Sequence, residues 1–233
     1  MNESGFAGQR TSPLAARTVS PVRIFLCDDH PLTRRGMIEL IAEQPDMEIC
    51  GQAAGVDEAF PKLKQTHPAV VIVDLSLRSG HGIELIEQIK KWNPRVKTLV
   101  VSAFDEKVYA ERCLRAGALG YLNKDEAPEK LIEAIRAVLE GNIYLTDQST
   151  NQMLQSMVGG RPSEEDPVAR LSNRELEVFT MIGQGLASKD IAERLILSRK
   201  TVDSHRENIK IKLNLGSGHE LTRYAMQWML EQR

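Results

Sequence analysis

Short apolar runs that end in polar residues recur through the first part of the chain. Val22–Cys27 is followed by two aspartates, and the run 69–73 contains three valines and an isoleucine and ends at Asp74. Runs of this length and β-branched content are typical of buried strands in a parallel sheet. Further strands are predicted on similar grounds at 47–53, 97–102 and 120–124.

Segments with apolar residues at helical spacing separate these predicted strands. Pro61 lies within one of them and weakens that assignment. Five strands that alternate with five helices predict an α/β fold with a doubly wound, five-stranded parallel sheet, spanning residues 21–141. The helices are expected over about 32–42, 56–65, 83–92, 106–116 and 128–140.

Two stretches outside this domain lack the pattern of a packed core. Residues 1–20 are rich in Gly, Ser, Thr, Ala and Arg without an apolar segment, so we expect a disordered leader rather than a secretory signal. Residues 142–169 end in a stretch rich in Gly, Pro and acidic residues, which is typical of a linker. A short helix over about 149–157 is compatible with the first part of this linker.

Residues 170–233 are predicted to form a second, smaller domain of four helices. Ser172 and Glu175 have the spacing of a capping box ahead of an apolar-periodic run that stops near Gly183. Two further helices, at about 188–195 and 198–213, are joined by a tight turn, which suggests a helix-turn-helix. The fourth helix carries an apolar stripe that suits the core alone or both the core and a dimer surface: Leu221, Tyr224, Ala225 and Trp228.

Composition narrows the setting in which the protein works. The chain has 233 residues, a net charge of -2 and 42% hydrophobic residues, which are ordinary values for a soluble globular protein. None of its apolar runs approaches the roughly 18 residues needed to span a bilayer. Its three scattered cysteines fit no metal-binding pattern and favour a reducing compartment, the cytoplasm.

Candidate chemistry gathers where the predicted strands end. Asp28, Asp29, Asp74, Ser102 and Lys124 each follow or close a strand, so a parallel sheet would bring them to one edge. Singly, such residues commonly form turns, caps or solvated ends. Together, three carboxylates call for a compensating cation such as Mg²⁺, and a carboxylate can act as a nucleophile toward a phosphoryl group.

This constellation resembles the receiver domain of bacterial two-component response regulators, which has a flavodoxin-like fold, over residues 22–140. The resemblance implies that Asp74 accepts a phosphoryl group from a histidine kinase. It also implies that Mg²⁺ is bound by Asp29 and Asp74, through water by Asp28, and by the backbone carbonyl of Ser76.

Three further roles come with the resemblance. Ser102 and Tyr121 would form a switch pair, in which the hydroxyl closes on the phosphate and the aromatic ring turns inward, while Lys124 would pair with the phosphoryl group. Two positions depart from the common pattern. Arg78 stands where the family often has proline, which predicts a looser loop, and Asp125 stands where many receivers have proline after the lysine.

Three segments of the second domain resemble the LuxR-type helix-turn-helix: Leu171 to Val178, Gly185 to Leu195, and Leu197 to Leu213. The combination of this helix-turn-helix with a receiver domain resembles the NarL/FixJ family of response regulators. The resemblance implies that the unphosphorylated receiver masks the DNA-reading helix, and that phosphorylation favours homodimers on double-stranded promoter DNA. The candidate DNA contacts are Lys189, Arg199, Lys200, Thr201, Asp203, Ser204, His205, Arg206, Glu207, Asn208, Lys210 and Lys212.

The resemblance also implies different roles within this set. Asp203, Ser204 and Glu207 stand where the LuxR-type family tends to contact base edges in the major groove, and an acid or a serine can form such contacts. Most of the lysines and arginines suit phosphates, which position a protein on DNA without reading its sequence. Thr201, His205 and Asn208 are expected to be structural or to contact phosphates.

Two other functions are compatible with parts of the sequence. A phosphatase with an aspartyl-phosphate intermediate usually carries a second aspartate two residues after the nucleophile, but Ser76 occupies that position. A DNA-binding regulator that is independent of phosphorylation could use its receiver only for dimerisation. The intact acidic set argues against this second function. We therefore expect a transcription regulator that is controlled by phosphorylation, and not an enzyme.

Overall fold

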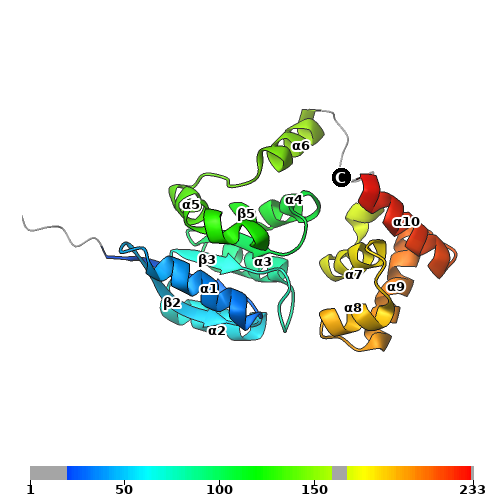
Figure 1. The fold of residues 1–233 in the computed structure, drawn as a ribbon, viewed down its shortest axis with the longest axis horizontal. Coiled ribbons are helices and arrows are strands. Elements are labelled where there is room, and N and C mark those ends of the chain that lie inside the picture. Colours follow the sequence, from blue (N-terminus) through cyan, green and yellow to red (C-terminus); the bar gives the residue numbers. More distant parts are fainter. Residues whose placement is uncertain (1–19, 159–166, 232–233) are drawn as a thin grey trace, which may run out of the picture.

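The structure is a computed structural model that describes residues 20–158 and 167–231. Most of the leader predicted at 1–20 and the glycine- and proline-rich part of the linker therefore lie outside the described residues. Within them, a layered α/β domain is followed by a cluster of helices (Figure 1).

The α/β domain is built on a single sheet in which all strand pairs are parallel. The strand order β2-β1-β3-β4-β5 confirms the predicted doubly wound topology. The strands are β1 (Val22–Cys27), β2 (Met47–Ala53), β3 (Val70–Val73), β4 (Lys97–Ser102) and β5 (Gly120–Asn123).

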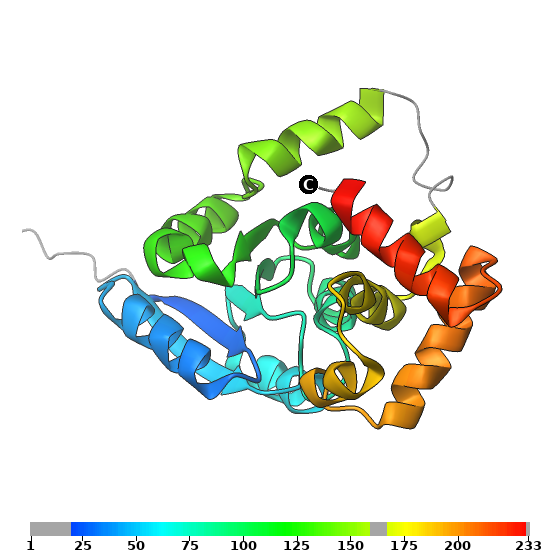
Figure 2. The same cartoon turned by 45° about the vertical axis from the view of Figure 1, so that its right-hand side comes forward.

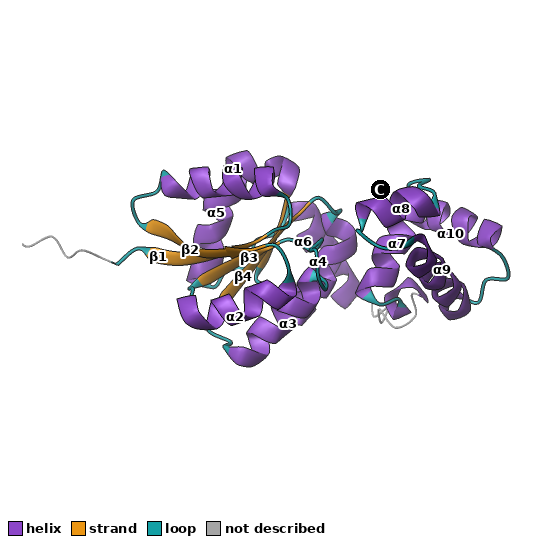
Figure 3. Cartoon of the chain, turned by 90° about the horizontal axis from the view of Figure 1, so that it is seen from below, coloured by secondary structure: helices purple, strands orange, loops and turns teal. Residues whose placement is uncertain are grey.

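Helices cover both faces of this sheet (Figure 3). One face is covered by α1 (Pro31–Ala42) and α5 (Ala127–Glu140). The other is covered by α2 (Val56–Thr66), α3 (Gly82–Trp92) and α4 (Glu106–Ala116).

Strand β3 shows why the run before Asp74 is apolar throughout. Val70 and Ile72 join the buried cluster under α1 and α5, whereas Val71 and Val73 join the cluster on the opposite face. Successive side chains of a strand point to opposite faces, so a strand covered on both sides needs an apolar residue at every position. The central position of β3 also places Asp74 at the middle of the sheet edge.

Pro61 does not end helix α2, contrary to the doubt that the sequence raised. The proline ring is exposed, and so is Asp57, whose carbonyl would have received the missing N–H bond. Ala59 and Leu63 are completely buried against the sheet and hold the helix in place. Packing of this apolar face therefore outweighs the loss of one exposed hydrogen bond.

Helices make up the rest of the described chain. The predicted capping box is confirmed, since Glu175 N donates to Ser172 Oγ and Ser172 N donates to Glu175 Oε2. Ser198 caps the helix that follows it by accepting the Thr201 N–H. The helix before it begins at Ser188, as predicted, and the N–H of its N-cap residue Ala187 donates to the Asp190 carboxylate. These elements are α6 (Asp147–Val158), the 3₁₀ turn η2 (Pro167–Arg170), α7 (Asn173–Gly183), α8 (Ser188–Arg194), α9 (Arg199–Leu213) and α10 (Gly218–Glu231).

The two domains are in contact, with α7 facing the α3 and α4 side of the α/β domain (Figure 2). Buried residues of α3 and α4 and buried residues of α7 belong to one hydrophobic cluster. Among the described helices, none is both long and apolar enough to cross a membrane.

Candidate functional site

Three strand ends meet in an acidic pocket at one edge of the sheet. Asp28 follows β1, Asp74 follows β3 and Lys124 follows β5. The Lys124 Nζ lies 2.6 Å from Asp74 Oδ2 and 2.9 Å from Asp28 Oδ2. The convergence predicted from the sequence is therefore present, with the lysine between two buried carboxylates.

His30 is a member of the pocket that the sequence reasoning missed. The His30 Nδ1 lies 2.7 Å from Asp29 Oδ1 and 3.9 Å from Asp74 Oδ2. The backbone N–H of His30 donates to Asp28 Oδ1. Single ligand atoms of Asp28, Asp29, His30 and Asp74 all lie within 4.8 Å of one another. In the sequence, the position of His30 directly after two aspartates was the one signal for its place in the site.

Burial dominates the electrostatics of Asp74, which is 2% exposed. Burial raises the pKa of its carboxyl to about 6, against the opposing effect of the Lys124 ammonium, and the nearby Asp28 charge raises it further. For Lys124, burial lowers the pKa, but attraction to Asp74 and Asp28 outweighs it and leaves that pKa above its ordinary value.

The pocket retains capacity for a cation. Asp28 Oδ2, Asp29 Oδ1 and Asp74 Oδ1 are buried and have no hydrogen bond, although Lys124 lies close to the first of them and His30 to the second. Buried carboxylate oxygens normally have partners. A hard divalent cation with oxygen ligands, such as Mg²⁺, fits this donor set.

Ser102 and Tyr121 lie beside the pocket and are both buried. The Ser102 hydroxyl is close enough to lower the pKa of Asp74. The Tyr121 hydroxyl donates to the Phe104 carbonyl at 2.9 Å. The aromatic ring is therefore already inward, the orientation that the resemblance implies for the phosphorylated state.

The loop after Asp74 is held to its neighbours. Arg78 N donates to the Ala54 carbonyl at 3.1 Å, and Val56 N donates to the Ser79 carbonyl at 3.0 Å. A proline in place of Arg78 could not make the first of these bonds. Arg78 thus contributes a hydrogen bond to the loop, which counts against the looser loop expected from the sequence. Ser76 lies in this turn, and its carbonyl as a metal ligand stays a prediction.

Helix α9 presents most of its polar residues to solvent. Val202 and Ile209 are buried and Leu213 is half-buried, as expected for its inner face. Thr201, His205, Arg206 and Lys210 are half-buried. The exposed candidates are Lys189 on α8, and Arg199, Lys200, Asp203, Ser204, Glu207, Asn208 and Lys212 on α9.

Some of the candidate DNA contacts have partners within the domain. Lys212 Nζ lies 2.6 Å from Glu175 Oε2 and so ties the end of α9 to the cap of α7. Burial raises the pKa of Glu175, but the bonds from Lys212 and Ser172 outweigh it and leave that pKa low. Lys210 Nζ lies 2.9 Å from Glu207 Oε2. Near the start of α9, Arg199 Nε lies 3.9 Å from Asp203 Oδ2, in a longer pair whose side chains are both exposed.

Comparisons with known families agree with both parts of this geometry. The model of the response regulator receiver domain matches residues 24–136, and that of the bacterial regulatory proteins of the luxR family matches residues 169–225. The chain belongs to the two-component response regulators that join a receiver to a LuxR-type DNA-binding domain. It is therefore a DNA-binding transcription regulator and not an enzyme.

Particular relatives extend over most of the chain. Oxygen regulatory protein NreC of Staphylococcus epidermidis is 37% identical over 212 residues, which cover 88% of this chain and 97% of that protein. NreC of Staphylococcus aureus is 36% identical over 211 residues, with the same coverage.

Solved structures show the same architecture. A LuxR-family response regulator from Aurantimonas sp. SI85-9A1 is 32% identical, has a TM-score of 0.55, and covers 60% of this chain and 99% of its own. RcsB of Salmonella enterica serovar Typhimurium, bound to promoter rprA with the phosphomimetic BeF3-, has a TM-score of 0.58 at 24% identity. It covers 89% of this chain and 99% of its own, and it shows a shared fold.

Proposed function

We propose that Asp74 accepts a phosphoryl group from a histidine kinase and that its phosphorylation controls DNA binding by the second domain. The observation that carries this proposal is the position of Asp74, buried between Lys124 and two further aspartates with unsatisfied oxygens. Attack by an Asp74 carboxylate oxygen would form a new O–P bond as the N–P bond to the kinase histidine breaks.

The neighbouring residues would each support this transfer. Asp28, Asp29, Asp74 and the Ser76 carbonyl would hold Mg²⁺, which supplies positive charge to the phosphoryl oxygens. Lys124 would exchange its contact with the Asp74 carboxylate for one with a phosphoryl oxygen. The Ser102 hydroxyl would donate to another of these oxygens, and the inward Tyr121 ring leaves room for it to approach.

For DNA recognition, we propose that α9 enters the major groove. Its exposed Asp203, Ser204 and Glu207 would contact base edges. Arg199 and Lys200 would contact phosphates, together with Lys189. Lys210 and Lys212 are weaker phosphate candidates because they pair with carboxylates at 2.9 Å and 2.6 Å. The pairs of Lys189 with Glu193 and of Arg199 with Asp203 are longer, at 3.9 Å, and exposed.

The expected masking of the DNA-reading helix takes a different form in the structure. The receiver packs against α7, and the candidate base-reading residues of α9 remain exposed. We propose that the receiver controls DNA binding through the position of α7 and through homodimer formation on paired half-sites. RcsB has been described as dimers bound to DNA, which supports this assembly.

We also propose the boundaries of the domains and the compartment in which the protein works. The receiver would span 21–141, the linker 142–169 and the DNA-binding domain 170–233, after a leader at 1–20. The protein would work in the cytoplasm, where the kinase domain and promoter DNA are both accessible.

The test is DNA affinity with and without a phosphoryl mimic. Bound fragments from a genomic library would first be sequenced to obtain a target site. Fluorescence anisotropy on that site should then show tighter binding when beryllofluoride and Mg²⁺ are added to wild type, and no change for Asp74→Asn. Equal affinity of the wild type in both conditions would overturn the proposal.

A further inference from the structure

Unsatisfied buried polar atoms occur in only two places among the residues that the structure describes. Three of the five are the carboxylate oxygens of the acidic pocket. The other two are His81 Nε2 and Glu177 Oε1, which lie 3.2 Å apart across the boundary between the two domains. His81 is 3% exposed and Glu177 is 0% exposed.

The first side of this pair is oriented by helix α3. His81 is the N-cap of α3, and its Nδ1 accepts the Ile83 N–H at 3.1 Å. The Nδ1 lone pair is therefore in use, so the proton of a neutral imidazole is on Nε2 and faces Glu177.

The second side is oriented by a guanidinium group. Glu177 Oε2 lies 2.5 Å from Arg174 Nη1, and Arg174 Nη2 donates to the Leu195 carbonyl at 2.9 Å. Oε1 is left to face His81. The pair thus connects α3 of the receiver with α7, and through Arg174 with the end of α8.

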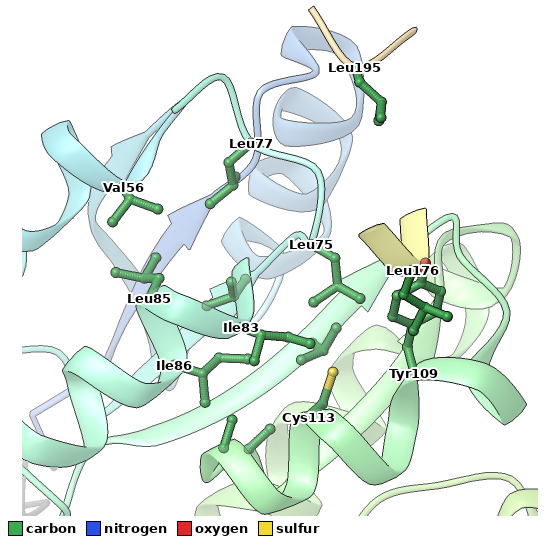
Figure 4. Close-up of a cluster of buried hydrophobic side chains, with 14 of the residues drawn as sticks. Val56, Leu75, Leu77, Ile83, Leu85, Ile86, Tyr109, Cys113, Leu176 and Leu195 are labelled. Atoms are coloured by element: carbon green, nitrogen blue, oxygen red, sulfur yellow. The ribbon is translucent and has the colours of Figure 1, made fainter. Parts of the chain in front are cut away.

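Around the pair, the interface is apolar and has better-satisfied contacts. Figure 4 shows Tyr109 of α4 and Leu176 of α7 in one cluster of buried side chains. The Tyr109 hydroxyl lies 3.4 Å from Thr180 Oγ1, and Arg112 donates to the Leu171 carbonyl at 2.8 Å. These contacts hold the domains together, whereas a buried polar pair without a good hydrogen bond weakens their association.

The pair is connected to the phosphoacceptor by a short, tightly closed loop. Ser76 forms a β-bridge with His81, and Gly82 N donates to the Leu75 carbonyl at 3.0 Å. A Cβ added at Gly82 would lie 2.2 Å from the Asp74 carbonyl oxygen. The two ends of the loop are therefore in contact, which gives a displacement at Asp74 a direct route to the backbone that carries His81.

We propose that His81 and Glu177 form a weak interdomain latch, through which the loop of Asp74 controls whether the receiver stays docked on α7. The latch rests on the proposed function in that phosphorylation of Asp74 is what displaces the loop. Its two orphaned atoms keep the docked arrangement only marginally stable, so a small movement of His81 releases α7.

The proposal predicts opposite effects from two kinds of variant of the full chain. His81→Asn keeps a side chain that can cap α3 but is too short to reach Glu177, and it should release the latch. The double variant His81→Leu with Glu177→Leu replaces the polar pair with apolar side chains and should tighten docking. His67→Asn makes the same change at the exposed C-cap of α2 and is the matched control, which should stay near wild type.

Amide hydrogen exchange without DNA measures the docking directly. Peptides from 106–116 and 173–183 should exchange several-fold faster in His81→Asn, at the level of wild type with beryllofluoride and Mg²⁺. The double variant should exchange no faster than wild type and should resist opening by beryllofluoride. The latch proposal would be overturned if His81→Asn exchanged at the wild-type rate, or if the double variant exchanged faster than the wild type.

DNA affinity measured on the same samples separates this proposal from the one on which it rests. If beryllofluoride opens the wild type without tightening DNA binding, the proposed function fails while the latch stands. If beryllofluoride tightens DNA binding but His81→Asn leaves the exchange unchanged, the latch fails while the proposed function stands.

Discussion

Lys124 Nζ lies 2.6 Å from Asp74 Oδ2, and this contact joins residues that are 50 positions apart in the sequence. Lys124 also lies 2.9 Å from Asp28, so one half-buried ammonium group compensates two buried carboxylates. The same lysine is therefore important for stability before any phosphoryl group arrives.

Replacing Lys124 with methionine should destabilise the receiver strongly in the absence of Mg²⁺. The change leaves Asp28 and Asp74 without their cation, and removal of one partner from a buried pair costs about 3–5 kcal/mol. Urea unfolding would measure the loss, with Lys130→Met as the control. Lys130 forms an exposed pair with Glu126, so its replacement should have little effect on the free energy of unfolding. Similar losses for the two variants would contradict the role assigned to Lys124.

The pKa of Asp74 predicts how stability changes with pH. Because burial raises this pKa from 3.8 to about 6, the folded chain binds the proton more tightly than the unfolded chain. The resulting stabilisation is fully present below about pH 3.8 and is lost as pH rises through about 6.

Asp74→Asn removes this titration. Relative to wild type in EDTA, the variant should gain about 2.4 kcal/mol of unfolding free energy between pH 4 and pH 7, because most of the difference between the two pKa values is expressed in this range. Chemical unfolding of both proteins at each pH would measure it. A difference between variant and wild type that does not vary with pH would show that the pKa of Asp74 is not raised.

Mg²⁺ should stabilise the folded receiver through the three aspartates. At a free concentration of about 100 times its dissociation constant, a ligand of the folded state adds about 2.7 kcal/mol. Thermal unfolding with Mg²⁺ and with EDTA would show the shift, and Asp29→Ala should abolish most of it because Asp29 Oδ1 is one of the unsatisfied oxygens. Asp57→Ala, at an exposed position at the start of α2, should leave the shift intact.

Two lysines of α9 should differ in their effect on DNA binding. Lys200 is exposed near the N-terminus of the helix, so Lys200→Ala should reduce the slope of log affinity against log salt by about 1 without altering stability. Lys212 pairs with Glu175, so Lys212→Ala should mainly lower the unfolding free energy. Salt titrations of DNA affinity, combined with urea unfolding, would separate the two effects, and equal salt slopes for both variants would contradict the assignment.

Local patterns were sufficient for most of the fold. The β-branched runs, the helical spacing and the Ser172–Glu175 box depend on residues close in sequence, and each appears in the structure. The helix predicted over about 56–65 despite Pro61 is confirmed, because an exposed missing hydrogen bond matters less than the burial of Ala59 and Leu63. Propensity at one position does not report how much apolar surface the whole helix buries.

The part of the site that lies at the strand ends could be predicted from the sequence. Asp28, Asp74 and Lys124 meet because parallel strands present their carboxyl ends at one edge. His30 could not be assigned in this way, since it follows the strand by several residues and only the path of the chain into α1 brings its ring to Asp29 and Asp74.

The sequence by itself determined the sheet, the acidic edge and the helix-turn-helix, because all three arise from periodic burial and short-range caps. Only the tertiary structure decided that α7 and not α9 faces the receiver, and that Glu177 is buried opposite His81. In the sequence, Glu177 resembles any solvated helix residue. Its burial depends on the docking of two separate cores, whose contact joins residues 96 positions apart and leaves no periodic signal in either segment.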